Sequence, residues 1–261
     1  MKYKTIGILG GMGPLATLDF EHKLLSLVVA KSDQDYPTII SFNDPSIPDR
    51  TDALIGTGES PLPRLVENAE KLKNAGVELI CMPCNTAHAF LPELKRTVKE
   101  VEFVDMIDAT VSVIERLRMQ HVGVLCTDGT RMSGTFEAAL EKRGLTTIYP
   151  SLDEQKSFVM DAIYGPMGIK AGNIFTGRVL LEHAAESLVN NGAQCVILGC
   201  TEIAMALDNG EVPYLDSSLI LARETLNRAD KTKSESIEAS KIIQTHKFAA
   251  FSTNTFPLIT G

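Results

Sequence analysis

Met82-Pro83-Cys84-Asn85-Thr86-Ala87-His88 and Leu198-Gly199-Cys200-Thr201-Glu202-Ile203 are the two stretches that decide the fold. Each places a cysteine where a short apolar run stops and a helical pattern begins, with Asn85 or Thr86 as the expected cap of the first helix and Thr201 of the second. Short, bounded apolar runs are typical of buried parallel strands. Both cysteines are therefore expected at the carboxyl end of a strand and the amino end of a helix. Open α/β sheets bind ligands there, and a thiol's pKa falls there.

These stretches belong to an internal repeat, because Cys84 and Cys200 are 116 residues apart (200 minus 84) and the same offset aligns other positions. Gly7-Ile8-Leu9 aligns with Gly123-Val124-Leu125 in this way. An offset that stays constant over nearly 80 residues indicates two similar halves, which usually pack about a pseudo-twofold axis. Such an axis would bring the two cysteines to opposite walls of one cleft.

We therefore predict an α/β fold of two pseudosymmetric domains. Each is a mainly parallel four-stranded sheet flanked by helices, and the active site lies in the interdomain cleft. The predicted boundaries are 1–108 plus 213–228 for the first domain, 109–212 for the second, and 229–261 for a C-terminal appendage. Residues 43–51 contain two prolines and are predicted to form a loop.

Composition excludes several classes of protein. A chain of 261 residues with 44% hydrophobic and 22% charged residues is ordinary for a soluble globular protein. The net charge of −8 and a pI near 5.2 argue against nucleic acid or an anionic membrane as a partner. No apolar run approaches the length of a membrane span. Five cysteines without a recognisable secretory signal predict reduced thiols in the cytoplasm.

Two motifs admit more than one interpretation. Gly11-Met12-Gly13-Pro14-Leu15-Ala16 satisfies the dinucleotide fingerprint, but Asn43 stands where its acidic residue is expected. A tight turn whose N–H groups line a small anionic substrate is the favoured alternative. Cys81, Cys84 and His88 have the spacing of part of a metal site, but two further ligands are missing nearby.

Cys84 and His88 could also act as nucleophile and base in a thiol hydrolase, an interpretation that leaves Cys200 without a role. The simplest structural alternative makes both cysteines buried packing residues, which does not account for their matched positions. Arg50 and Lys170 are loop cations framed by proline or glycine. A guanidinium in such a loop can hold a carboxylate with two hydrogen bonds.

Five stretches together resemble the aspartate/glutamate racemase family, most closely its aspartate racemases. They are IGILGGMG (6–13), IPDRT (47–51), MPCNTAH (82–88), GIKAG (168–172) and LGCTEI (198–203). The resemblance covers about residues 5–228. It implies a cofactor-independent homodimer, without pyridoxal phosphate or metal, that acts on a small amino acid through one cysteine on each side of its Cα.

Carried over by motif, the resemblance makes Cys84 and Cys200 the catalytic acid/base pair. The implied substrate-binding residues are Met12, Arg50, Asn85, Thr86, Thr127, Lys170, Thr201 and Glu202. The implied reaction interconverts L- and D-aspartate. Two alternatives remain at this point. One is a related cysteine enzyme acting on glutamate, methylaspartate, maleate or an arylmalonate, and the other is a small-anion binding protein without chemistry.

Overall fold

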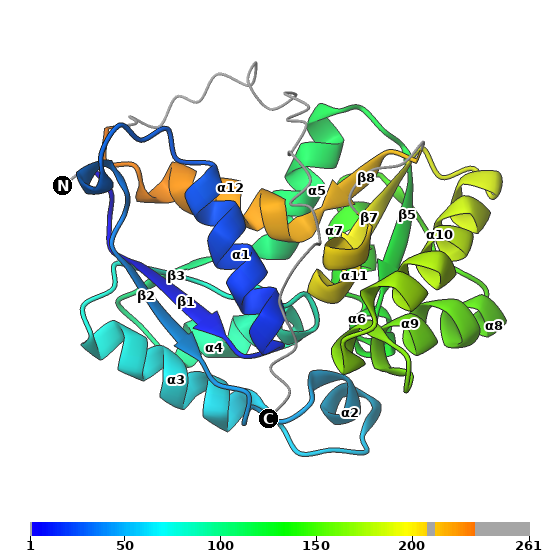
Figure 1. Cartoon of the computed structure of the whole chain (residues 1–261), viewed down its shortest axis with the longest axis horizontal. Coiled ribbons are helices and arrows are strands. Elements are labelled where there is room, and N and C mark those ends of the chain that lie inside the picture. Colours follow the sequence, from blue (N-terminus) through cyan, green and yellow to red (C-terminus); the bar gives the residue numbers. More distant parts are fainter. Residues whose placement is uncertain (1, 208–211, 233–261) are drawn as a thin grey trace, which may run out of the picture. The chain divides into compact units, whose positions relative to one another are not determined.

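The strands form two separate four-stranded parallel sheets of the same order, in a computed structural model that describes residues 2–207 and 212–232. The first sheet has the order β2-β1-β3-β4 and the second β6-β5-β7-β8, as Figure 1 shows. Their bounds are β1 (Ile6–Gly10), β2 (Ile39–Asn43), β3 (Leu79–Cys81), β4 (Glu102–Val104), β5 (His121–Cys126), β6 (Thr146–Ile148), β7 (Cys195–Gly199) and β8 (Tyr214–Asp216). Every described strand pair is parallel. The predicted fold class of two parallel α/β sheets is confirmed.

The 116-residue offset holds for the two central strands of each sheet. A Cβ added at Gly7 of β1 would come within 3.0 Å of Val77 and 3.3 Å of Ile80. A Cβ added at Gly123 of β5 would come within 3.2 Å of Ala193 and 3.1 Å of Val196, which are the same positions one offset later. The edge strands do not keep the offset, since β2 and β6 begin 107 residues apart and β4 and β8 begin 112 apart. The repeat is therefore faithful at the centre of each sheet, where the cysteines lie, and not at the edges.

Helices cover both faces of each sheet. In Figure 1, α1 and α12 lie over one face of the first sheet and α3 and α4 over the other. The helices of the first half are α1 (Pro14–Ser26), η1 (Asp33–Asp35), α2 (Arg50–Ile55), α3 (Leu62–Asn74), η2 (Thr86–Phe90) and α4 (Leu91–Thr97). Those that follow are α5 (Met106–Arg116), α6 (Asp128–Ser133), α7 (Thr135–Glu141), α8 (Leu152–Glu154), η3 (Gln155–Met160), α9 (Asp161–Tyr164), η4 (Ile169–Ala171), α10 (Ile174–Asn190), α11 (Thr201–Ala206) and α12 (Ser217–Ala229). None of the described helices has the length and apolarity of a membrane span.

The predicted loop 43–51 ends earlier than expected, because Arg50 and Thr51 already form the first turn of α2. The Asp49 side chain accepts hydrogen bonds from the backbone N–H groups of Thr51 and Asp52, which caps this helix. The cap therefore holds Arg50 on a helix, where its side-chain direction is fixed.

The chain returns to the first half later than the predicted boundary at residue 213. Residues 214–216 form β8 and pair with β7 in the second sheet. Only α12 then packs against α1 and the first sheet, where Leu221 and Ala222 are fully buried. The predicted appendage 229–261 lies outside the described residues from residue 233 onward.

Candidate active site

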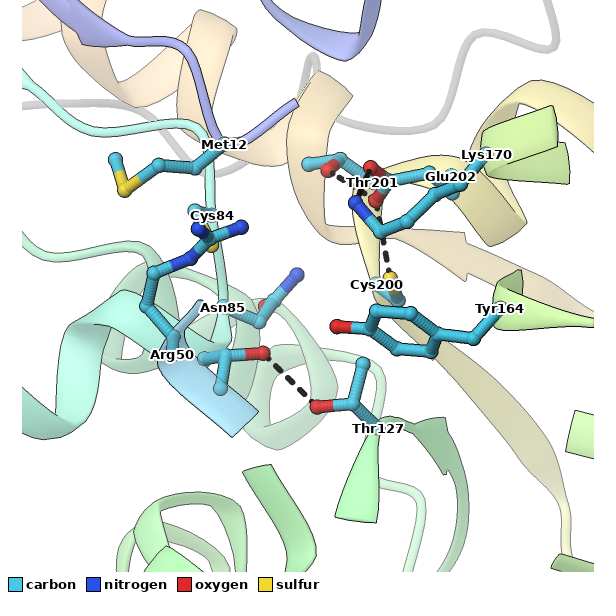
Figure 2. Close-up of a pocket in the computed structure, with 11 residues that line it drawn as sticks. Met12, Arg50, Cys84, Asn85, Thr127, Tyr164, Lys170, Cys200, Thr201 and Glu202 are labelled. Atoms are coloured by element: carbon cyan, nitrogen blue, oxygen red, sulfur yellow. Dashed lines mark hydrogen bonds and ion pairs between the residues drawn. The ribbon is translucent and has the colours of Figure 1, made fainter. Parts of the chain in front are cut away.

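One pocket is lined by all ten residues that the sequence singled out, together with Tyr164. Its lining is Met12, Arg50, Cys84, Asn85, Thr86, Thr127, Tyr164, Lys170, Cys200, Thr201 and Glu202. Eight of these residues follow the carboxyl ends of β1, β3, β5 and β7, whereas Arg50 lies after β2, and Tyr164 and Lys170 lie after β6. In Figure 2 Cys84 belongs to one wall of the pocket and Cys200 to the other. The free space between the side chains holds about one water molecule.

Cys84 lies beside a buried cation. It follows β3 and precedes η2, and Figure 2 shows the Arg50 guanidinium next to its thiol. Arg50 Nη1 donates to the carbonyls of Ile47 and Pro48 at 3.3 and 3.1 Å, while its buried Nε has no hydrogen-bond partner among the described residues. Burial lowers the pKa of Arg50, but attraction to the Cys84 sulfur and to Asp49 outweighs burial and raises it. The Arg50 guanidinium is therefore a fixed positive charge beside the Cys84 sulfur.

Cys200 lies beside a carboxylate. Its Sγ–H donates to Glu202 Oε2 at 3.2 Å, and Thr201 Oγ1 donates to the same oxygen at 3.1 Å. The other oxygen, Oε1, forms an ion pair with Lys170 Nζ at 2.6 Å. Burial and the negative charge of Glu202 raise the pKa of Cys200 well above its usual value, and Lys170 offsets only part of this effect. This environment favours the protonated thiol.

The helix that follows Cys200 begins one residue earlier than predicted. Cys200 itself is the N-cap residue of α11 in extended conformation, and Thr201 is the first helical residue. The Thr201 hydroxyl does not cap the helix, because it donates to Glu202. The sequence therefore located this helix start but assigned the cap to the wrong residue.

Hydroxyl groups from both halves meet at the base of the pocket. Thr86 Oγ1 lies 2.9 Å from Thr127 Oγ1 and 2.9 Å from Thr130 Oγ1. Asn85 Nδ2 donates to Ser217 Oγ at 3.1 Å, which leaves Asn85 Oδ1 buried without a partner in the described part of the chain. An unsatisfied polar atom in a pocket wall is available to a ligand.

Two repeat-related glycines allow the halves to approach each other. A Cβ at Gly129 would lie 2.7 Å from Thr51 Cα, and a Cβ at Gly13 would lie 3.2 Å from Glu202 Oε1. Each glycine thus faces the opposite half.

Tyr164 and Thr130 are the residues that the sequence reasoning missed. The Tyr164 hydroxyl lies 3.3 Å from Thr51 Oγ1 and donates to Asp49 Oδ2 at 3.4 Å, so it joins α9 to the start of α2. Lys170 Nζ lies 5.4 Å from the centroid of its ring. Tyr164 belongs to no motif, and its place in the pocket depends on how the segment 152–164 packs.

His88 does not act on the Cys84 thiol. Its Nε2 accepts from the backbone N–H of Met106 at 3.0 Å, so the proton is on Nδ1, which donates to the Cys84 carbonyl at 2.8 Å. Both ring nitrogens are occupied by backbone groups, which excludes the cysteine–histidine hydrolase interpretation in this arrangement.

Cys81, Cys84 and His88 do not form part of a metal site among the described residues. Cys81 Sγ donates to the Gly7 carbonyl at 3.4 Å, within the sheet. Across residues 2–207 and 212–232, no three His, Cys, Asp or Glu side chains are grouped so that they could hold a metal ion.

Comparison with known proteins identifies the family. The family model for Asp/Glu/hydantoin racemases matches residues 9–225. The chain belongs to this racemase family. The broad-specificity amino-acid racemase RacX of Bacillus subtilis is 30% identical over 228 residues, which cover 85% of this chain and 96% of RacX. The glutamate racemase of Pseudomonas aeruginosa strain UCBPP-PA14 is 28% identical over 183 residues, or 64% and 65% of the two chains.

A solved structure supports the same assignment. The aspartate racemase of Picrophilus torridus superimposes with a TM-score of 0.76 at 32% identity, covering 86% of this chain and 94% of that protein. The two parallel sheets are therefore those of a racemase fold. The family accounts for the match between the sequence motifs and a single pocket, and it leaves open which amino acid this member racemises.

Proposed function

We propose that this protein is a cofactor-independent racemase that interconverts L- and D-aspartate, with Cys84 and Cys200 as the two acid/base groups. The observation that best supports the proposal is the pair of buried thiols in one pocket with opposite electrostatic partners. Racemisation needs a base on one face of Cα and an acid on the other. Two sulfurs on opposite walls of the pocket, one beside the cation Arg50 and one beside the carboxylate Glu202, meet this requirement.

In one direction the Cys84 thiolate removes the α-proton from the enantiomer that presents it, and the Cys200 thiol protonates the opposite face. The reverse reaction starts with Cys200 as the thiolate and Cys84 as the thiol. The α-proton of an amino acid is a very weak acid, so aimed hydrogen bonds and charges must stabilise the carbanion. Asn85, Thr86, Thr127 and Thr201 are proposed to hold the α-carboxylate for this purpose.

The charges of the pocket favour an amino dicarboxylate as substrate. Among the lining residues, Arg50 and Lys170 are cations and Glu202 is a carboxylate, which is the inverse of a substrate with two carboxylates and one ammonium group. In our proposal the two cations lie by the carboxylates, and Met12 forms part of the wall.

The racemase proposal is tested by incubating the protein with L-aspartate without added cofactor and following D-aspartate by chiral chromatography. L-glutamate, methylaspartate and L-alanine are run in parallel, because RacX is named for broad specificity. Maleate and an arylmalonate test the other cysteine chemistries. The Cys84→Ala/Cys200→Ala double variant is the blank. Failure to racemise any amino acid would contradict the proposal and favour a binding protein.

We further propose that the protein is a cytoplasmic homodimer, as the family resemblance implies. Light scattering on the purified chain of 28.4 kDa should then give about twice that mass, and cell fractionation should recover the protein with cytoplasmic markers. A monomer mass at working concentration would contradict the dimer.

A further inference from the structure

The pocket has too little room for a substrate unless a side chain moves. Its free space holds about one water molecule, which is far less than an amino acid needs. Nine of the eleven lining residues are buried. The other two are Tyr164, which is 39% exposed, and Lys170, whose side chain is 27% exposed. The Tyr164 ring is rigid and its hydroxyl contacts Thr51 and Asp49, whereas Lys170 has a flexible four-carbon stem, so Lys170 is the side chain better able to move.

Lys170 yields by leaving Glu202. The ammonium group of Lys170 ends inside the pocket, 2.6 Å from Glu202 Oε1. This carboxylate is the single acidic side chain among the described pocket residues, and it is 5% exposed. A buried carboxylate that loses its cation is costly, so Lys170 leaves readily only if another cation takes its place. An amino acid brings such a cation in its α-ammonium group.

The position of Glu202 fits an α-ammonium group in particular. That group is bonded to Cα, the atom whose proton is exchanged, so its partner must lie close to a catalytic sulfur. Glu202 Oε2 accepts a hydrogen bond from Cys200 Sγ at 3.2 Å. Gly13 leaves the space over Oε1 open, because a Cβ there would approach to 3.2 Å. The other catalytic sulfur has a cation, Arg50, beside it and thus cannot offer the same site.

We propose that Glu202 recognises the α-ammonium group of the substrate and that Lys170 occupies this place in the free protein. Binding is then an exchange, in which the substrate ammonium pairs with Glu202 and the released Lys170 pairs with the second carboxylate. A dicarboxylate without an amino group can pair with Lys170 only if Glu202 is left without a cation. This inference rests on the proposed function, and it predicts selection for amino dicarboxylates over maleate-like substrates.

The test compares L-aspartate with succinate, which is aspartate without its amino group, in titration calorimetry of the full chain. The unmodified protein should bind aspartate at least tenfold more tightly than succinate, which corresponds to about 1.4 kcal/mol. In Glu202→Gln this preference should fall close to onefold, because aspartate binding weakens and the freed Lys170 binds succinate at least as well. The matched control is Glu67→Gln, since Glu67 is a surface carboxylate paired with Lys71 and Arg64. It should keep the parent preference.

Gly13→Ala provides a second variant if Glu202→Gln does not fold. Its Cβ crowds Glu202 Oε1 without changing any charge, so it should reduce aspartate affinity more than succinate affinity. The deciding variant is Glu202→Gln or, where that variant does not fold, Gly13→Ala. If this variant keeps the tenfold preference for aspartate while the parent racemises aspartate, the proposed role of Glu202 is wrong and the proposed function stands. A parent that neither binds nor racemises aspartate overturns the proposed function as well.

Discussion

Removing the two cysteines one at a time should give two different half-enzymes. In Cys84→Ala only Cys200 can exchange a proton, and in Cys200→Ala only Cys84 can. Each variant should therefore exchange the α-hydrogen of one enantiomer with deuterated solvent, and the two variants should select opposite enantiomers. Net racemisation should fall by at least ~10²-fold in both, which is typical of losing a positioned acid or base.

The structure also predicts which half-enzyme is faster. A Cys200 thiolate would lie 3.2 Å from Glu202, and at an effective dielectric constant of about 20 two such charges repel by roughly 5 kcal/mol. The cation paired with Glu202, which is Lys170 in the free protein and the substrate ammonium in our proposed complex, cancels most of this repulsion. If a quarter remains, about 1.3 kcal/mol, exchange slows nearly tenfold. Cys84 has Arg50 beside it instead, so Cys200→Ala should exchange its enantiomer roughly tenfold faster than Cys84→Ala exchanges the other.

The assay is deuterium uptake into L- and D-aspartate, followed by proton NMR. The control is Cys195→Ala, which removes a buried cysteine of β7 outside the pocket and should leave exchange of both enantiomers intact. A single-cysteine variant that racemises near the parent rate, or that exchanges both enantiomers, would refute the two-thiol reasoning. Faster exchange by Cys84→Ala would refute the argument that Glu202 disfavours a thiolate at Cys200.

Three further predictions concern the support around the site. Arg50→Ala removes the cation beside Cys84 and should lower kcat/KM for aspartate at least tenfold, since a hydrogen bond to a charged group contributes ~1.5–3 kcal/mol; unchanged turnover in a chiral assay would rule this role out. His88→Leu leaves the Cys84 carbonyl and the Met106 N–H unpaired and should lower the unfolding free energy in urea by about 1–3 kcal/mol. His88→Gln keeps a donor and an acceptor, so equal losses in both variants would speak against the bridge. Burial raises the pKa of Cys81 and Cys126 to about 12, so above about pH 9 the unfolded chain binds fewer protons than the folded one and stability should fall as pH rises. Unfolding free energies measured in urea from pH 8 to 10 should fall with pH, and Cys126→Ala should reduce this slope by up to ~1.4 kcal/mol per pH unit. A slope that is unchanged in Cys126→Ala would contradict a buried neutral thiol.

The centre of each sheet could be predicted because local signals and the repeat agree there. Strands β1, β3, β5 and β7 combine apolar runs with a fixed offset, and the turns after them carry eight of the eleven pocket residues. To predict such a turn, it is enough to recognise an apolar strand that is followed directly by the first residues of a helix. This reasoning, applied to two similar halves, accounts for eight of the ten predicted residues in the pocket, and Arg50 and Lys170 reach it from the segments after β2 and β6.

The edges and the loops could not be predicted in the same way. Prolines at 45 and 48 suggested that the loop continues through residue 51, but Asp49 caps α2 and the helix begins at Arg50. The capping signal was present in the sequence and was outweighed by the prolines. Tyr164 had no signal at all, because its contact with Thr51 joins segments 113 residues apart in the chain.

The repeat also implies two equivalent sulfurs, and the difference between them arises where the repeat fails. One offset relates Asn85 to Thr201 and Thr86 to Glu202, so a hydroxyl beside the first cysteine becomes a carboxylate beside the second. Arg50 follows the edge strand β2, where the offset no longer holds. A racemase cannot favour one enantiomer at equilibrium, because the equilibrium constant is one, so kcat/KM must be equal for both. Unequal sulfurs can therefore make kcat differ between the two enantiomers only if KM differs by the same factor. The repeat positions the two reacting groups, and the unmatched residues decide which sulfur carries the proton when substrate arrives.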